Sequence, residues 1–328
     1  MFRHWNGERI VLFVLLLLSG VRALGCGPVF PNTILGDAEY ELLLSPDCHF
    51  ATELQELYPA GFAGPTRAGL FLRANVTTLQ AATNELQSCF LADGQLTPRE
   101  RSLLDAFGQA RKAVADHWDN ATVFNDRLRW QGSHDGAQVA PIFPDVTIPD
   151  ALPFEFGEYF RGAVAWHTGD AATAQLAWES VLEKPESERR YRSTWAAYML
   201  GRSRVESAPQ QAVEHFQEVR ALAERGFKDA LGLARASLGW EAYTELHRNN
   251  FGRAANLYTK QYVAGDATAI VSLRVVAAKI MKGDAETLAI AVRDERTRPI
   301  VTAYLLSKQS ELWRRSEDGV NDICRWMD

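Results

Sequence analysis

The stretch from residue 154 to residue 185 constrains the fold most, because it carries a helical apolar period in two successive runs. In the first run, apolar residues recur three or four positions apart, the period of one helix face: Phe156, Phe160, Ala163 and Trp166. Gly169-Asp170 interrupts this pattern, and Pro185 ends the second run. The second run places on one face Ala174, Ala177, Trp178, Val181 and Leu182. We therefore predict two short amphipathic helices joined by a tight turn.

The pattern of the second helix recurs along the C-terminal half of the chain. A small residue followed four positions later by an aromatic one occurs at Ala174/Trp178, Ala212/Phe216 and Ala254/Tyr258, with a weaker form at Leu288/Val292. The intervals between these steps are 38, 42 and 34 residues. Uneven intervals indicate insertions in the turns of a repeated helix pair. The alternative is a chance recurrence in an alanine-rich helical protein.

This pattern resembles the tetratricopeptide repeat, a helix pair with a period of about 34 residues. The residues that carry the resemblance are Gly162, Gly169, Ala174, Trp178 and Pro185. The proline lies one residue early, and Val181 stands where the family usually has a small residue. The resemblance implies an all-α fold, a right-handed α-solenoid of helical hairpins, in which the first helix of each pair lines a concave face that binds peptides.

Carried over residue by residue, the resemblance places aromatic side chains in that groove. The predicted groove residues are Trp166 and His167 in the first pair, Trp195 and Tyr198 in the second, and Trp240 and Tyr243 in the third. Aromatic side chains give a large contact area at a small cost in entropy, which suits ligand binding. The alternative is that these rings form the core between repeats.

A basic cluster opens the second predicted repeat at Arg189, Arg190 and Arg192. We predict that Arg189 and Arg192 bind a carboxylate of the ligand, because the guanidinium fork matches carboxylate geometry. Glu183, Glu186 and Glu188 are adjacent in the sequence, so local ion pairing is the alternative account of the cluster.

Residues 1–25 have the features of a signal peptide. Arg3 and Arg9 are followed by an apolar run over residues 10–18, too short to span a bilayer. Ala23 and Gly25 precede Cys26, so cleavage there leaves an N-terminal cysteine, which resembles the acylated cysteine of a bacterial lipoprotein. We expect simple secretion of the chain to the periplasm, outer membrane or cell surface of a bacterium. The alternatives are acylation of Cys26, which would be its only link to the membrane, and an uncleaved anchor.

The four cysteines are candidates for disulfides, since an even number in an exported chain favours pairing: Cys26, Cys48, Cys89 and Cys324. Three connectivities are open. No close Cys-x-x-Cys pair is present, so we predict no metal site.

The remaining chain divides into an N-terminal loop-rich and helical region (26–118), a Pro/Gly-rich connection (119–153) and the repeat region (154–328). Periodicity predicts a helix over 77–91. Thr97 with Glu100 forms a capping box that begins the next helix, expected to end near 118. Past the first helix pair, a helix is expected over 187–204. Residues 26–64 read as extended segments and loops. A helical stack needs a covered end, and no polar cap follows the last predicted helix.

The composition and motifs exclude several functions. A net charge of −6 argues against non-specific nucleic-acid binding, which needs a basic surface. The sequence contains no nucleophile elbow, zinc-protease, phosphate-binding or dinucleotide-binding motif, so we predict no cofactor. We expect a scaffold that binds a protein or peptide. The alternatives are an envelope enzyme with a site near residues 119–153, including His117 or His134, and a structural subunit of an envelope complex.

Overall fold

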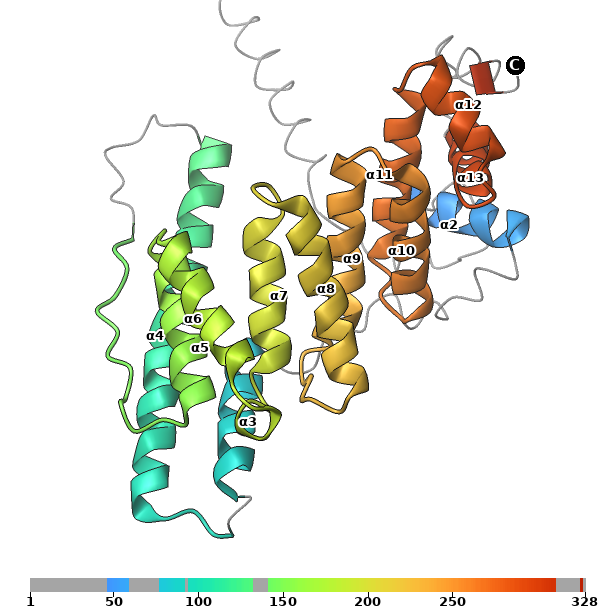
Figure 1. Ribbon diagram of the computed structural model, residues 1–328. Coiled ribbons are helices and arrows are strands. Elements are labelled where there is room, and N and C mark those ends of the chain that lie inside the picture. The colour runs from blue at the N-terminus through green and yellow to red at the C-terminus, as the bar shows by residue number, and fades with distance from the viewer. Residues whose placement is uncertain (1–45, 59–76, 92–93, 132–140, 311–324, 327–328) are drawn as a thin grey trace, which may run out of the picture.

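The computed structural model describes residues 46–58, 77–91, 94–131, 141–310 and 325–326. These residues form twelve α-helices and no strand, which confirms the all-α class (Figure 1). Nine of the helices belong to the C-terminal half: α5 (Phe154–His167), α6 (Ala171–Glu183), α7 (Ser193–Arg204), α8 (Pro209–Glu224), α9 (Leu233–His247), α10 (Phe251–Val263), α11 (Ala269–Met281), α12 (Ala285–Arg293) and α13 (Thr297–Ser310).

Close helix contact explains the small residues of the sequence pattern. Gly162 on α5 faces Trp178 on α6, and a Cβ at Gly162 would lie 2.4 Å from the indole Nε1. Gly201 on α7 faces Phe216 on α8 in the same way, with a Cβ 2.6 Å from the ring. Each glycine lets a large ring of the second helix pack against the backbone of the first. The third pair differs, because Gly239 on α9 faces Gln261 on α10.

The turns follow the local signals in the sequence. Gly169 has φ +86°, a left-handed conformation that favours glycine. The side chain of Asp170 accepts a hydrogen bond of 3.0 Å from the N–H of Thr173 and so caps α6. Asp284 caps α12 through Thr287 in the same manner, at 2.9 Å.

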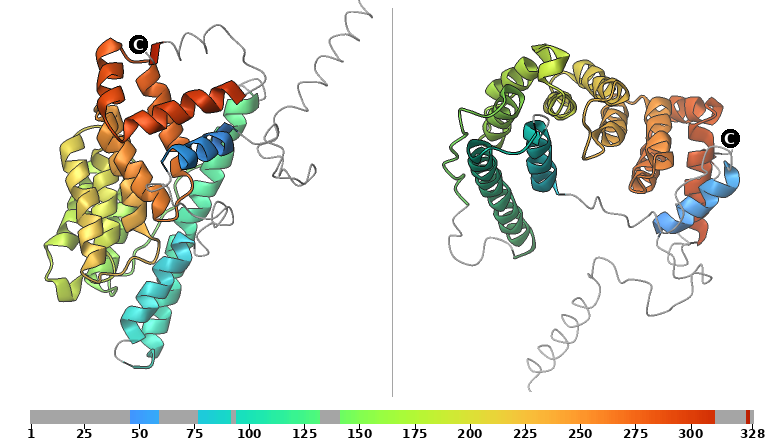
Figure 2. Two further views of the ribbon diagram at one scale, coloured as in Figure 1. Left: turned by 90° about the vertical axis from the view of Figure 1, so that its right-hand side faces the viewer. Right: turned by 90° about the horizontal axis from the view of Figure 1, so that it is seen from below.

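The helix pairs follow one another along a curved row, seen end-on in the right-hand view of Figure 2. Two N-terminal helices, α3 (Thr78–Leu91) and α4 (Pro98–Gln131), lie at the beginning of this row, with α3 on its inner side. The predicted capping box of α4 is present: the N–H of Glu100 donates to the Thr97 hydroxyl at 3.2 Å, and the N–H of Thr97 donates to the Glu100 carboxylate at 2.7 Å.

The opposite end of the row is covered by α2 (Pro46–Leu57), the earliest helix of the described chain (Figure 1). Phe50 and Leu54 on α2 are fully buried in a hydrophobic cluster with α9, α10, α11 and α13. Gln55 of α2 donates to the Tyr262 hydroxyl at 3.3 Å. Residues that precede α3 in the chain therefore cover this end of the row, and Trp326 packs against the same cluster.

Three predicted boundaries were wrong. α4 continues to Gln131, so residues 119–131 belong to a helix and not to the irregular connection. The prolines that exclude a helix begin only at residue 141, and 119–131 contains neither proline nor glycine. α2 lies inside the 26–64 segment, for which mainly extended segments and loops were predicted. α7 begins at Ser193, after a short 3-10 turn at Glu186–Glu188, and not at residue 187.

Several predictions fall outside the described residues. They concern the signal peptide over residues 1–25, the acylation of Cys26, the disulfide candidate Cys324 and the candidate enzyme residue His134. Cys48 lies in the first turn of α2 and Cys89 on α3, and the disulfide pairing stays a prediction. Among the helices that the structure describes, none is both long and apolar enough to cross a membrane.

Candidate binding groove

Two hollows open on the side of the row formed by the first helices of the pairs. The hollow nearer the N-terminal helices, here called the arginine pocket, has a volume of about 410 Å³ and is lined from α3, α4, α5 and α7. The residues that define it are Arg111, Trp118, Trp166, His167, Trp195 and Arg202. The second helices α6 and α8 contribute no lining residue.

Arg111 is the central charge of the arginine pocket. Its guanidinium lies 5.3 Å from the centroid of the Phe160 ring, and its Nε has no hydrogen-bond partner among the described residues. Burial lowers the pKa of Arg111, whereas the nearby Tyr159 opposes that shift. Arg111 forms no ion pair among the described residues, although Asp119 also lines the pocket. A buried cation that lacks an ion-pair partner favours an incoming anion.

An aromatic cluster forms the outer wall of the same pocket. Trp118 on α4 contacts His167 on α5, with ring centroids 5.2 Å apart, and the segment before α5 adds Phe143, stacked on His167 at 6.3 Å. Burial lowers the pKa of His167, and Arg111 and His117 act in the same direction. His167 therefore stays neutral at pH 7, so the positive charge of this pocket comes from the arginines.

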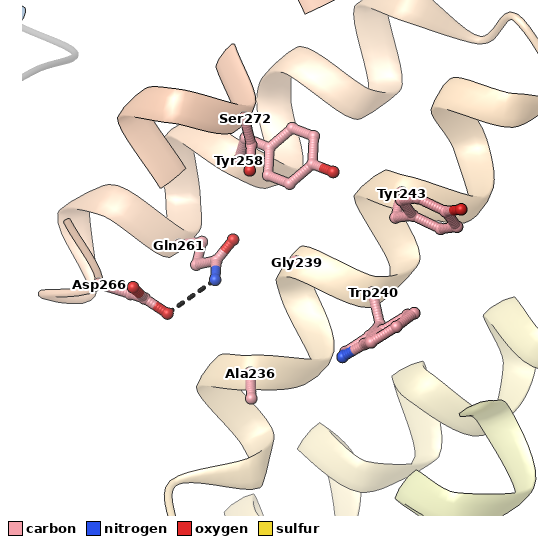
Figure 3. A pocket seen from close by; sticks show the side chains of 8 residues that line it. All are labelled: Ala236, Gly239, Trp240, Tyr243, Tyr258, Gln261, Asp266 and Ser272. Atoms are coloured by element: carbon pink, nitrogen blue, oxygen red, sulfur yellow. Dashed lines mark hydrogen bonds between the residues drawn. The ribbon is translucent and has the colours of Figure 1, made fainter. Parts of the chain in front are cut away.

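The second hollow, here called the Gln261 pocket, has a volume of about 320 Å³ and lies among α9, α10 and α11 (Figure 3). Its defining residues are Trp240, Tyr243, Tyr258, Gln261, Asp266 and Ser272. Gly239 lies at its base, where a Cβ would come within 2.6 Å of the Gln261 Oε1. The glycine therefore makes the room in which the Gln261 amide lies.

Burial raises the pKa of Tyr258 to about 12, while a hydrogen bond with Ser272 opposes the shift. The phenol thus keeps its proton at any physiological pH. Tyr243 is 38% exposed at the mouth of the pocket. The pocket combines aromatic ring faces with hydroxyl, amide and carboxylate oxygens, whereas the arginine pocket presents cations.

Arg202 connects the two pockets. It lines the arginine pocket, and its guanidinium lies 3.9 Å from the centroid of the Trp240 ring in the Gln261 pocket. Burial raises the pKa of Tyr198, which lies on the same helix, and Arg202 opposes that shift. The two pockets are thus neighbours, with Arg202 and Trp240 at their junction, and are together called the groove here.

The structure brings most of the predicted aromatic residues to this groove. Trp166 and His167 line the arginine pocket, and Trp240 and Tyr243 line the Gln261 pocket. Trp195 reaches the arginine pocket but is only 3% exposed. Tyr198 is half-buried and packs edge-on against Phe216. The shared Trp-x-x-Tyr spacing therefore does not give the second and third pairs the same environment.

The two predicted arginines are placed elsewhere. Arg189 donates to the Lys184 carbonyl at 2.7 Å and to the Ser193 hydroxyl at 2.9 Å, so it stabilises the turn before α7. Arg192 is 1% exposed and forms an ion pair of 2.9 Å with Glu85 on α3. The predicted role of Arg192 in an accessible groove was wrong, because its guanidinium is enclosed by α3, α5 and α7.

Sequence reasoning missed Arg111, Arg202, Gln261 and Asp266. Arg111 lies on α4, outside the helix pairs on which the groove prediction was based. Arg202 lies beside Gly201, and the sequence pattern did not identify Gly201 as a close-contact glycine. A comparison of Gly162 with Gly201 would have drawn attention to the first helix of the second pair. No local signal identifies Gln261, since its role depends on Gly239 and on Asp266 after the end of α10.

Within the described part of the chain, no group of three or more His, Cys, Asp or Glu side chains has the placement of a metal site. His117, the described histidine near the connection, packs edge-on against Phe143 at 5.1 Å. Comparisons with protein families, with curated proteins and with solved structures yield no match to this chain.

Proposed function

We propose that this protein is a scaffold that binds a segment of another protein or a peptide in the groove formed by the two pockets. The observation that carries the proposal is the contact of Arg202 with Trp240, which places an arginine-rich hollow beside an acceptor-rich hollow. Exposed aromatic rings beside aligned charges are features of peptide-binding surfaces.

The proposal includes the repeat type and the location of the protein. The close contacts of Gly162 with Trp178 and of Gly201 with Phe216, and the curved row of helix pairs, support a right-handed α-solenoid of tetratricopeptide-like hairpins. The apolar run over residues 10–18 and the following Cys26 support export to the bacterial envelope or surface, with or without acylation.

Arg111 and Arg202 take the orienting role that sequence reasoning assigned to Arg189 and Arg192. Both line the arginine pocket, together with the indole of Trp118, which is 58% exposed. An acidic side chain or a C-terminal carboxylate of the partner would lie near these guanidinium groups. The aromatic rings would supply the affinity, and the guanidinium charges would fix the position of the bound segment along the groove.

The groove distinguishes this proposal from a purely structural subunit. That alternative requires the predicted aromatic residues to be buried against neighbouring helices, which is true of Trp195. Trp166, His167, Trp240 and Tyr243 instead line open hollows. No observation on the described residues favours the envelope enzyme.

The experiment that tests the proposal is site-specific photocrosslinking in the native envelope. A photoreactive phenylalanine replaces Trp118 in one variant and Tyr243 in another, one for each pocket. The matched control carries it at Leu176 on α6, which is 67% exposed and lines neither pocket. We expect the same partner segment to crosslink from residues 118 and 243 and not from residue 176.

A second measurement removes dependence on the crosslinker. Peptides of the captured segment are titrated against Tyr243→Ala and Leu176→Ala, and we expect about 10-fold weaker binding to the first variant only, as for an aromatic contact residue. Capture from residue 176 alone, or equal affinity of both variants, would move the binding face away from the groove.

A further inference from the structure

Gln261 is a buried amide whose orientation is determined by a neighbouring carboxylate. Its Nε2 donates to Asp266 at 2.8 Å, and a carboxylate only accepts hydrogen bonds, so the amide oxygen must point the other way. Figure 3 shows this oxygen turned away from Asp266, toward the space between α9 and α10. The side chain of Gln261 is only 7% exposed.

The Gln261 Oε1 is an acceptor with no hydrogen-bond partner among the described residues. A buried acceptor without a donor costs about 1–3 kcal/mol, so such groups in folded proteins usually have a protein, water or ligand donor. Gln261 lines an open pocket, but this oxygen is itself buried in the wall, so a donor from outside the chain reaches it only after a small shift of the Gln261 side chain.

Asp266 adds a negative charge to the same wall. Its carboxylate accepts from Gln261 and from the N–H and hydroxyl of Thr268, and it forms no ion pair within the described residues. Two arginines of the surrounding helices have other contacts: Arg202 lies over the Trp240 ring, and Arg235 donates to the Ala264 carbonyl at 3.4 Å. The carboxylate is therefore uncompensated by direct pairing.

Three aromatic rings complete the lining, from Trp240, Tyr243 and Tyr258. Aromatic faces attract cations, and they also pack against the methylene stem of a long side chain. The pocket thus offers a carboxylate, an acceptor without a donor and ring faces. A volume of about 320 Å³ admits one side chain and not a folded segment.

We propose that the Gln261 pocket binds one cationic N–H donor, the ammonium of a lysine or the guanidinium of an arginine, from the segment bound in the groove. Its N–H groups donate to the Gln261 Oε1 and the Asp266 carboxylate, and its stem lies along Trp240 and Tyr258. This inference rests on the proposed binding function and assigns the chemistry of one end of the groove. With the arginine pocket, it gives the partner an acidic group toward α4 and a basic group toward α11.

The test uses small probes, so that it does not depend on a partner peptide. The full chain is labelled with 5-fluorotryptophan, and the fluorine resonance of Trp240 is assigned from its absence in Trp240→Phe. n-Butylammonium and n-butylguanidinium are titrated beside N-butylformamide, a neutral donor of similar size. We expect saturable shifts of the Trp240 resonance and about 5-fold tighter binding of at least one cation than of the formamide.

Two variants locate the binding groups. Asp266→Asn and Gln261→Met should each weaken binding of the cation by about 5-fold, with little effect on the formamide for Asp266→Asn. Asp170→Asn is the matched control, because Asp170 also accepts a hydrogen bond from a nearby backbone N–H but lies outside the pocket. It should leave cation binding unchanged.

The outcomes separate this site from the wider function. Equal binding of formamide and cations, or a Trp240 resonance that responds to no probe, overturns the cation site even if a peptide binds the groove. Saturable, Asp266-dependent cation binding supports the site even if the photocrosslinking finds no partner. The stronger of the two cations distinguishes a lysine from an arginine of the partner.

Discussion

The guanidinium of Arg192 lies 2.9 Å from the carboxylate of Glu85, and both side chains are almost fully buried. The same guanidinium donates to the Ala82 carbonyl at 3.0 Å and lies 4.5 Å from the ring centroids of Phe156 and Trp195. This ion pair joins α3 to α7 across the inner side of the row. It therefore holds α3 against the beginning of α7.

Replacing Arg192 by methionine should destabilise the protein by about 3–5 kcal/mol, because Glu85 is left buried without its partner. Urea unfolding of the variant measures this loss. The double variant Arg192→Met, Glu85→Gln should recover part of it, since the unpaired charge is removed. Arg161→Met is the control: its ion pair with Glu158 is exposed, and we expect a loss under about 1 kcal/mol. A similar loss in both single variants would contradict the role of the buried pair.

Glu155 should make stability depend on pH. Burial raises the pKa of its carboxyl to about 7 from the ordinary value of 4.5, although the N–H groups of Arg192 and Tyr191 oppose this shift. Between those two pH values the folded state keeps a proton that the unfolded state releases. The free energy of unfolding contributed by this group therefore falls as pH rises through that range, by on the order of 3 kcal/mol.

The measurement is urea unfolding from pH 4.5 to 8 for the native protein and Glu155→Gln. The glutamine oxygen can still accept from the two backbone N–H groups that lie 2.8 and 2.6 Å from the Glu155 carboxylate. The variant should lose less stability as pH rises. Burial also raises the pKa of Glu85, which therefore changes the stability of both proteins in the same direction. The difference between their two pH profiles is thus due to Glu155. Parallel pH profiles would refute the assignment.

Gly162→Ala should destabilise the first helix pair, because its methyl group would lie 2.4 Å from the Trp178 indole. Overpacking of this kind costs about 1–3 kcal/mol. Gly157→Ala on the same helix is a matched control, since its nearest neighbour would be at an ordinary 3.8 Å. That variant should gain up to about 1 kcal/mol from the better helix propensity of alanine. Thermal or urea unfolding measures the stability of both variants. Equal changes in stability would contradict the close contact of Gly162 with the indole.

Phe50→Ala should loosen the far end of the row, because the α2 ring is fully buried against the C-terminal helices. Truncating a buried phenylalanine costs about 3–5 kcal/mol. Hydrogen exchange should show faster exchange in α11 and α13 and little change in α5. Leu57→Ala, at a residue 42% exposed on the same helix, should change stability by under about 1 kcal/mol. Unchanged exchange in α13 after Phe50→Ala would contradict the capping role of α2.

Local features were predictable because neighbouring residues produce them. The turn at Gly169-Asp170 and the capping box of Thr97 and Glu100 depend on groups within four residues of each other, and both are present. The groove was predicted only in part. Trp166, His167, Trp240 and Tyr243 line it, because an aromatic residue on a first helix often faces that side. Arg111 and Arg202 were not found, since their place depends on α4 packing beside α5 and α7.

The sequence by itself determined that this chain is helical and where its first helix pair turns, since these properties follow from local period and capping. Only the tertiary structure decided that Arg192 is buried against Glu85, that α2 covers α13 and that Gln261 faces a hollow beside Asp266. The physical reason is that burial and pairing depend on groups far apart in the chain. The sequence alone led to the prediction that Arg192 contacts a ligand in an open groove. Because α3 packs over it, Arg192 is instead a core residue.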